Sequence, residues 1–557
     1  MQKQDLIEIK IEDMLDDGRC FARVDGLAIF VSGGVYGDIV KAEVTKVKKS
    51  FAEAKILEVV KPSKFRIKND CEYMDRCGGC TLRELRYDEQ LQLKRKNVIS
   101  KLERIAGIEN PKVNDVIGAE TKNSYRNKAV FAVGKCGEVG FMKAKSNHVL
   151  DIYNCQIQKD TAMVCAEALR EYEKNLEKKS NIKKMTVKTA IETGEVMVCL
   201  ASDVLKIPRA EELVNMLDDA VYETGASLES VAIIMSGRGK SEKDLKVEII
   251  AGKRTIKDKI IRPDGRIIEF EISPLSFYQV NSEQMIKLYD KAMEYAGLTG
   301  KETLLDIYCG VGTIGIYMAD KAARVIGIES VKPAVIDANR NSVINGIINT
   351  RYVCGKAEDV LPDLFSTADS TYSKITDNPF RDDLILHNKT VAILDPPRSG
   401  CDSALLAALI ENKVDKIVYV SCDPGTLARD IKILSEGGYD FVEATPVDMF
   451  PYTSSIESVA LLSKLDVDKH ISVEIELDEM DLTSAESKAT YAQIKEYVWN
   501  KFELKVSTLY IAQIKKKCGI ELREHYNKSK KEKQIIPQCT PEKEEAIMDA
   551  LRHFKMI

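Results

Sequence analysis

The chain has 557 residues, of which 44% are hydrophobic and 30% charged, and its net charge is −5. This composition is typical of a globular protein of several domains, and it excludes nucleic-acid binding driven by overall positive charge. No apolar run approaches the roughly 20 residues of a membrane-spanning helix. The first residues lack a basic segment followed by an apolar core, so we expect no signal peptide. Fourteen cysteines then indicate thiols or metal ligands in a reducing cytoplasm.

Residues 1–61 predict a small β-barrel. Short alternating runs are separated by Asp-Gly and Gly-Gly pairs, a pattern typical of closely spaced strands. Nine lysines and arginines against three glutamates occupy residues 41–68, interleaved with Phe51 and Phe65. Barrels with a basic, aromatic face often bind oligonucleotides. A merely solvated strand face is the alternative, and this segment alone leaves both open.

A cysteine-rich segment follows the barrel. Cys71, Cys77 and Cys80 lie within ten residues, and the glycines before Cys80 let the backbone fold tightly around a shared centre. The last two cysteines alone are also typical of a redox dithiol, but no strand-helix-strand unit surrounds them. A fourth thiolate would complete an iron–sulfur or zinc site, and Cys155 is the candidate by its sequence context. Spacing does not choose between iron–sulfur and zinc.

Three further regions are expected along the chain. Residues 62–270 mix strands and helices and predict a central α+β domain that carries the cysteine site, with a helix near 88–106 packing on the catalytic domain. From 271 to 465 strands alternate with helices, which predicts an α/β domain with a Rossmann-like, doubly wound parallel sheet. Residues 466–557 predict a helix-rich extension of unknown role, interpreted as a solvated appendage rather than a second RNA site.

Strands of the α/β region end in residues that can carry chemistry. Gly310–Gly315 matches G-x-G-x-x-G after a strand, a weak signal shared by several nucleotide-binding enzymes. The next strand ends at Glu329, a carboxylate placed to hold a ribose diol. Two later strands end at Asp395, in Asp-Pro-Pro, and at Cys422. Ligands of open sheets bind at these strand ends, so we expect one shared crevice. A dehydrogenase has no obvious use for Asp-Pro-Pro or a thiol there, whereas an S-adenosylmethionine (SAM)-dependent methyltransferase has.

Cys422 lies between a predicted buried strand and a predicted helix. The apolar run 416–420 ends just before it, and Pro424 opens a helical pattern. A thiol at this position feels the positive end of the helix dipole, and we expect its thiolate to be favoured. The alternative is a small buried residue in a core turn.

Seven sequence blocks, in order, resemble the TRAM-containing RNA uracil-C5 methyltransferases of bacteria and are similar to the 23S rRNA enzymes. They are CGGC at 77–80 with Cys71 ahead, YRNKAVFAVG at 125–134, SFYQVN at 276–281, LLDIYCGVGTIG at 304–315, LDPPRSG at 394–400, VSCDP at 420–424 and IESVALLSK at 456–464. The resemblance covers about residues 1–465. The sequence departs from the family pattern in the block before the catalytic Glu. Many relatives have His there, whereas this chain has Tyr452 and Ser455.

The resemblance implies a TRAM barrel that binds RNA, SAM as the cofactor and a [4Fe–4S] cluster whose expected role is structural. Its implied partner is RNA, in the cytoplasm, with no membrane and no obligate protein partner. It also implies that Cys422 is the nucleophile and Glu457 the base. The implied SAM contacts are Gln279, Tyr308, Glu329 and Asp395, and the implied cluster ligands are Cys71, Cys77, Cys80 and Cys155.

The expected reaction is methylation at C5 of a specific uridine in 23S rRNA. Carbon 5 is too weak a nucleophile to attack a sulfonium methyl group, and addition of Cys422 to C6 makes it an enolate carbon. Glu457 then removes the C5 proton, which suits a carboxylate whose pKa is raised by an apolar strand. The target uridine must leave its stack to meet the thiol. Asp423 and Arg429 are weaker candidates for orienting the nucleotide.

Three alternatives stay open. Amino-group methyltransferases also use Asp-Pro-Pro, but they usually follow it with an aromatic residue, where this chain has Arg398, and they need no thiolate. The same reaction on tRNA is the second, although the related tRNA enzymes generally lack the barrel and the cysteines. A non-catalytic RNA-binding protein is the third, and the intact Cys422 and Glu457 argue against it.

Overall fold

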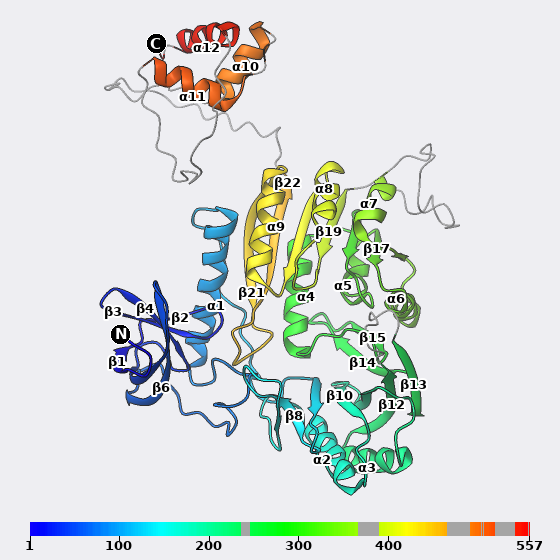
Figure 1. Ribbon diagram of the computed structural model, residues 1–557. Helices are drawn as coiled ribbons and strands as arrows, with labels where there is room; N and C mark the ends of the chain where they lie inside the picture. Colours follow the sequence, from blue (N-terminus) through cyan, green and yellow to red (C-terminus); the bar gives the residue numbers. More distant parts are fainter. Residues whose placement is uncertain are drawn as a thin grey trace. The chain divides into compact units, whose positions relative to one another are not determined.

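A computed structural model describes residues 1–235, 245–365, 389–464, 491–502, 504, 506–518, 541–554 and 556. The chain divides into two compact units, Met1–Val467 and Asp468–Ile557. The first unit contains the barrel, the central region and the large α/β sheet (Figure 1).

The N-terminal region forms a curled six-stranded sheet. The strands are β1 (Leu6–Lys10), β2 (Asp13–Met14), β3 (Cys20–Val24), β4 (Leu27–Ser32), β5 (Ile39–Val47) and β6 (Phe51–Lys61), in the order β1-β5-β6-β4-β3-β2. Strand β1 at one edge also contacts β3 near the other, so the sheet curls on itself. Alternate residues such as Ile29 and Val31 face the interior, as a half-buried strand requires. Leu82 and Leu85, from the segment after the barrel, complete the same core.

The central region is built on a second sheet with helices on one face. Its strands are β7 (Lys128–Val133), β8 (Val139–Met142), β9 (Val149–Asp151), β10 (Ile182–Thr189), β11 (Glu195–Ser202), β12 (Ser227–Met235) and β13 (Lys246–Gly252), in the order β13-β12-β11-β10-β7-β8-β9. Helices α2 (Asp160–Asn175) and α3 (Ala210–Tyr222) bury Leu169 and Leu217 against this sheet. A hairpin, β14 (Ile256–Ile261) and β15 (Ile267–Ile272), leads to the α/β region.

The third region is a seven-stranded mixed sheet covered by helices on both faces (Figure 1). Its strands are β16 (Thr303–Ile307), β17 (Arg324–Glu329), β18 (Thr350–Cys354), β19 (Thr390–Leu394), β20 (Lys416–Ser421), β21 (Tyr439–Val447) and β22 (Glu457–Lys464), in the order β18-β17-β16-β19-β20-β22-β21. Its helices are α4 (Ser282–Ala296), α5 (Thr313–Met318), α6 (Lys332–Ile344), α7 (Ala357–Phe365), α8 (Ser403–Glu411) and α9 (Pro424–Glu436). Strand β22 runs antiparallel to both of its neighbours, so the expected parallel sheet is in fact mixed.

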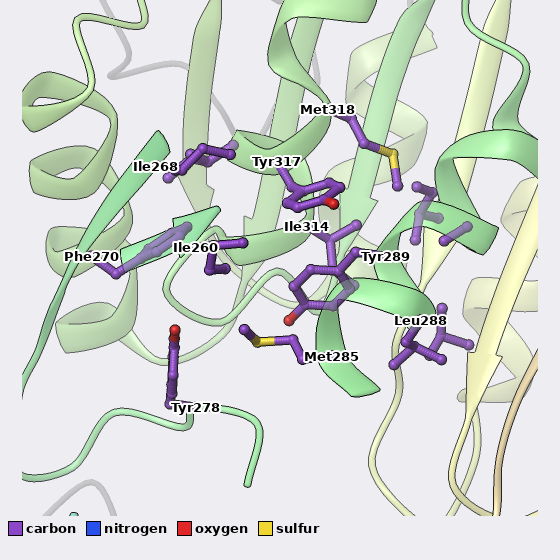
Figure 2. Packing of buried hydrophobic residues seen from close by; sticks show 14 of the residues in the cluster. Ile260, Ile268, Phe270, Tyr278, Met285, Leu288, Tyr289, Ile314, Tyr317 and Met318 are labelled. Atoms are coloured by element: carbon purple, nitrogen blue, oxygen red, sulfur yellow. The ribbon is translucent and has the colours of Figure 1, made fainter. Parts of the chain in front are cut away.

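One face of this sheet is sealed by aromatic and aliphatic side chains from three elements. Figure 2 shows Tyr289 of α4 and Tyr317 of α5 packing between the sheet and the β14–β15 hairpin, which contributes Phe270. The two tyrosine rings meet edge to face, with centroids 5.4 Å apart. Burying several large rings at one junction fixes the hairpin, and therefore the segment that follows it, against the sheet.

Helix α1 (Tyr87–Lys101), continued by the π-helical turn Leu102–Ala106, packs on α9 of the α/β region. Its residues Val98 and Leu102 belong to the same buried cluster as Leu427 and Ile431 of α9. The chain segment between barrel and central region is thus part of the core of the α/β sheet.

The second unit is a small helical body. Its helices are α10 (Tyr491–Phe502), α11 (Thr508–Lys517) and α12 (Pro541–His553), and side chains such as Ile494, Ile511 and Leu551 form its core. Within the part of the chain that the structure describes, no helix is both long enough and apolar enough to cross a membrane.

Candidate active site

Four predicted site residues lie at the carboxyl ends of four strands that are neighbours in the sheet. Glu329 is the last residue of β17, and Tyr308, Asp395 and Cys422 directly follow β16, β19 and β20. The sheet order β17-β16-β19-β20 brings these ends side by side. These strand ends therefore share one edge of the sheet, whereas the expected single crevice stays a prediction, because the cavity that Cys422 lines does not include Glu329 or Asp395.

The turn after β16 is shaped to face a ligand. Tyr308 has a left-handed backbone (φ 65°), and Gly312 has φ 81° just before α5 begins. The Gly310 amide donates to Glu329 Oε2 at 3.2 Å, and a second backbone amide donates to Glu329 Oε1 at 2.8 Å. A Cβ built on Gly310 meets no atom within 4 Å, so space is open beside the turn.

Gln279 comes from a different part of the chain. It lies between the β14–β15 hairpin and α4, is 6% exposed, and its backbone carbonyl accepts from Asn127 Nδ2 at 2.9 Å. Asn281, two residues on, caps α4 by accepting from the Gln284 amide. The segment is thus held firmly, although it belongs to none of the four strand ends.

Cys422 opens onto a cavity of about 350 Å³ in which three regions of the chain meet. The turn between β2 and β3 contributes Asp16 and Asp17, and α1 contributes Lys101. The remaining lining residues are Asn97, Arg398, Asp423, Pro424, Gly425, Ser454, Ser455 and Ile456. Cys422 is half-buried at this cavity, not packed inside a core turn.

Glu457 lies beside Cys422 because of the register between β20 and β22. Ser421 pairs with Ser458 in this antiparallel pair, so Cys422 and Glu457 are the next residues along the two chain segments, and the Glu457 charge acts on the Cys422 thiol. The carboxyl group is almost fully buried, with Glu457 5% exposed. Burial raises the pKa of Glu457 well above its usual range, Asp395 raises it further, and Arg398 opposes both.

The protonation of Cys422 differs from the expectation. Burial and then the nearby Glu457 raise the pKa of this thiol to about 11, while Arg398 lowers it. The prediction of a favoured thiolate was wrong because it considered only the helix dipole, and desolvation and a neighbouring carboxyl group outweigh that effect. Burial also raises the pKa of Asp395 to about 7.

The two weaker candidates have structural contacts. Asp423 caps α9, with Oδ1 accepting from the Gly425 and Thr426 amides at 2.8 and 3.0 Å. Arg429 pairs with Asp430 at 2.7 Å. Sequence reasoning missed Arg398, which faces both Cys422 and Glu457; its place directly after Asp-Pro-Pro was the available signal.

The four cysteines of the predicted metal site line one cavity of about 380 Å³, together with Tyr73. Burial raises the pKa of Cys80 to about 12, and Cys155 raises it next, so the thiols lie close enough to interact. Within the described ranges, however, no group of three or more His, Cys, Asp or Glu side chains is arranged to hold a metal ion. The geometry thus gathers the predicted ligands but does not support the metal-site prediction by itself.

The strand order, with a glycine-rich turn after its first strand and one antiparallel strand, defines a SAM-dependent methyltransferase fold. The model of the tRNA (uracil-5-)-methyltransferase family matches residues 86–465, and that of the TRAM domain matches residues 4–57. The chain belongs to this family of RNA uracil-5-methyltransferases.

Relatives agree with this assignment. An RNA methyltransferase of Caldanaerobacter subterraneus, described as uncharacterized, is 39% identical over 82% of this chain and 98% of its own length. A similarly described protein of Halalkalibacterium halodurans is 36% identical over 83% of this chain and 98% of its own. The crystal structure of Pyrococcus abyssi tRNA (uracil-54, C5)-methyltransferase with S-adenosyl-L-homocysteine matches with TM-score 0.60 and 27% identity, over 82% of this chain and 100% of that one.

Proposed function

We propose that the protein methylates C5 of a specific uridine in 23S rRNA, giving 5-methyluridine through a covalent adduct between Cys422 and C6. The observation that carries this proposal is that a buried carboxyl group, Glu457, lies close to the thiol of Cys422, which itself lines a cavity. Uracil C5 chemistry needs one nucleophile and one base on the same side of the site.

The reaction follows from these two groups. Cys422, after its proton passes to water, adds to C6, and the electron pair of the C5–C6 double bond moves toward O4. SAM, when bound, would supply the methyl group that the C5 carbon takes up, with S-adenosylhomocysteine as the leaving group. Glu457 then removes the C5 proton, the C5–C6 double bond forms again, and the Cys422 thiolate leaves. A carboxylate with a raised pKa is a stronger base, which suits the last step.

The strand ends fit SAM. Glu329 ends β17 with both oxygens held by backbone amides, and carboxylates at this point of such sheets accept from a ribose diol. The open space beside Gly310 leaves room for a ligand against the backbone. We assign Gln279, Tyr308, Glu329 and Asp395 as the residues that would hold SAM.

The cysteine cavity has the donor set of the [4Fe–4S] cluster that we propose for it. Four thiols around about 380 Å³ are the donor set that such clusters use. We assign Cys71, Cys77, Cys80 and Cys155 as its ligands and a structural role to the cluster.

The barrel supports RNA as the partner. Phe30 lies between Phe21 and Phe51 on three strands, with centroid distances of 6.0 and 5.5 Å. All three rings are partly exposed, and Arg19 stacks over Phe30 at 5.2 Å. Arg19 also pairs with Asp17, which lines the Cys422 cavity, so Arg19 connects the aromatic row to a residue of the cavity. Aromatic rows with arginines stack unpaired bases.

Transfer RNA is the second candidate substrate, because the Pyrococcus abyssi protein with a similar structure is a tRNA (uracil-54, C5)-methyltransferase. Mapping of 5-methyluridine in 23S rRNA and tRNA from a strain lacking the protein separates the two. Loss at one 23S uridine supports the proposal, and loss in tRNA alone replaces it with the second candidate. If no 5-methyluridine is lost from either RNA, the proposed reaction is wrong.

A further inference from the structure

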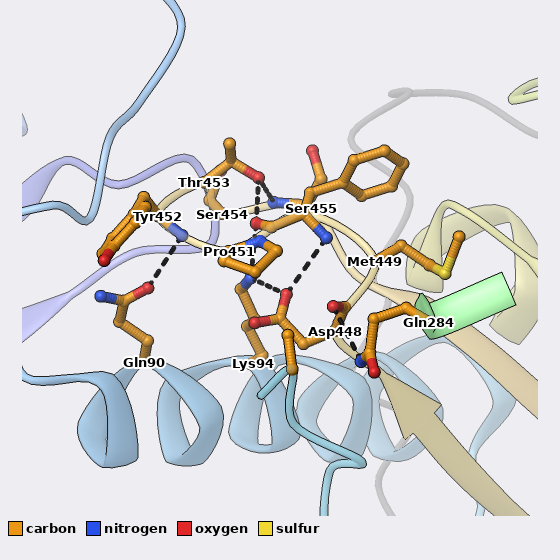
Figure 3. Close-up of polar contacts among 12 residues, drawn as sticks. Gln90, Lys94, Gln284, Asp448, Met449, Pro451, Tyr452, Thr453, Ser454 and Ser455 are labelled. Carbon is orange, nitrogen blue, oxygen red and sulfur yellow. Dashed lines mark hydrogen bonds and ion pairs between the residues drawn. The ribbon is translucent and has the colours of Figure 1, made fainter. Parts of the chain in front are cut away.

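Lys94 and Asp448 form a deeply buried ion pair at the end of β21. Lys94 Nζ lies 2.6 Å from Asp448 Oδ1, and Tyr87 Oη donates to the other carboxylate oxygen at 2.7 Å (Figure 3 shows Lys94 and Asp448). The side chains are 1% and 0% exposed. Burial lowers the pKa of Lys94, and Asp448 counteracts this. Buried ion pairs contribute little stability compared with apolar residues of the same size, so this one calls for another explanation.

The pair stands at the start of the loop 448–456, which joins β21 to β22. Val447, the last residue of β21, pairs with Glu457, the first residue of β22. The loop therefore begins and ends beside the proposed base. Its last three residues line the cavity of Cys422. Any shift of this loop moves the carboxyl group relative to a bound uracil.

The middle of the loop is held through its backbone by the segment that leads into and forms α1. Lys94 Nζ donates to the Phe450 carbonyl at 3.1 Å, and the Tyr452 amide donates to Gln90 Oε1 at 3.1 Å. The Tyr452 carbonyl accepts from the Thr81 amide at 3.0 Å. Figure 3 shows Gln90 and Lys94 reaching the loop from one helix. Residues of α1 and of the segment before it therefore hold the loop at several points along its backbone. The ion pair of Lys94 and Asp448 is the buried one among these contacts.

We propose that Lys94 and Asp448 are positioning residues that aim the Glu457 carboxylate at the C5 proton. The proposal rests on the proposed function, because it assigns the pair to one step of that reaction. A general base must lie within hydrogen-bond reach of its proton, and a misplacement of about 1 Å slows a reaction about 100-fold. Cys422 is held between β20 and α9, so a shift of this loop is expected to displace the Glu457 carboxyl group more than the thiol.

The test compares two steps in single turnover with SAM and the RNA substrate. The double variant Lys94→Met with Asp448→Asn removes both charges, so no unpaired charge stays buried. Formation of the covalent RNA adduct is expected within about threefold of the native rate, while its decay slows about tenfold or more. Adduct is therefore expected to accumulate and to be visible on a denaturing gel.

Arg262→Met is the matched control, since it removes a buried cation that pairs with Asp320. In this variant the ratio of the adduct-formation rate to the adduct-decay rate is expected to equal that of the native enzyme.

Equal slowing of both steps, or no slowing of either, in the folded double variant overturns the proposal. Hydrogen exchange of the amides at 448–456 gives an independent readout: faster exchange is expected in the double variant and not in the control, and unchanged exchange overturns the anchoring role. If the double variant does not fold, Thr81→Val removes the hydrogen bond from the Ser454 amide and must show the same excess of adduct. If the native enzyme methylates RNA without forming any adduct, the proposed function is wrong. The hydrogen-exchange result then tests only whether Lys94 and Asp448 anchor the loop.

Discussion

Cys422 lies opposite Glu457, at the next position after the pair of Ser421 and Ser458 in the register of β20 and β22. Directly opposed residues of an antiparallel pair point to the same face, with Cβ atoms about 5 Å apart. The paired part of β20 and β22 ends directly beside the thiol and the carboxyl group, and the effect of the Glu457 charge on the Cys422 pKa agrees with their closeness. The antiparallel direction of β22 makes this possible, because it starts where β20 ends.

Glu457→Gln is predicted to trap the covalent adduct. The amide keeps the shape of the side chain but cannot accept the C5 proton, so the thiolate cannot leave. Loss of a general base costs about 10²–10⁴-fold in turnover. The measurement is the amount of protein–RNA adduct that survives denaturation, which must exceed that of the native enzyme. Native turnover by this variant would rule out Glu457 as the base.

The rate of adduct formation is predicted to rise with pH across the neutral range. The reactive form of Cys422 is the thiolate and its pKa is raised to about 11, so lowering the pH removes the reactive form. Glu457 acts in the later step, in which the C5 proton is removed, so its raised pKa makes the decay of the adduct rise with pH as well. Single-turnover rates between about pH 6 and pH 10 check this. A rate that falls as pH rises contradicts it.

Arg398→Gln is predicted to move that pH profile to higher pH. The Arg398 guanidinium lowers the pKa of both Cys422 and Glu457, so its removal raises both. At neutral pH the variant is therefore slower, and raising the pH restores part of the rate. A lower rate at every pH with an unshifted profile would mean that Arg398 acts in another way.

Phe30→Ala is predicted to weaken RNA binding while the fold persists, because the ring is the centre of the aromatic row on the barrel. Stacking of a base on such a ring is worth about 1–3 kcal/mol, which corresponds to a roughly 5- to 150-fold loss of affinity. Titration of the RNA substrate measures this. Tyr222→Ala is the control, since that ring is 80% exposed on α3 and lies outside the barrel. Equal effects of the two variants would contradict a role for the row.

Cys80→Ser is predicted to abolish iron binding and the broad visible absorption of a cluster. The control is Cys136→Ser, because Cys136 is exposed and does not line the cysteine cavity. Iron and zinc analysis of the two variants and the native protein is the measurement. A colourless native protein that contains one zinc ion would replace the cluster with a zinc site.

The strand-end residues could be predicted from sequence because one rule applies to them all. Glu329, Asp395 and Cys422 each end an apolar run, and parallel strands bring such ends to one edge. The direction of β22 could not be predicted in this way, since an apolar run does not show whether its strand is parallel. The opposition of Cys422 and Glu457 thus became visible only in the register.

Contacts across long stretches of sequence were also beyond prediction. Lys94 and Asp448 are 354 positions apart, and each alone is an ordinary charged residue of a helix or loop. The protonation of Cys422 was mispredicted for a related reason: its burial and the carboxyl group beside it come from segments that the local pattern does not contain. The local sequence predicts the helix, and with it the effect of the helix dipole on the thiol pKa. The desolvation of the thiol depends on the whole fold.

The most direct measurement is methyl transfer from labelled SAM to the RNA substrate by Cys422→Ala. The sulfur is the only atom of the chain assigned to bond the pyrimidine, so the variant is predicted to transfer no methyl group and to form no adduct, while it still binds SAM. Methyl transfer by the folded variant at a rate near that of the native enzyme would contradict the account.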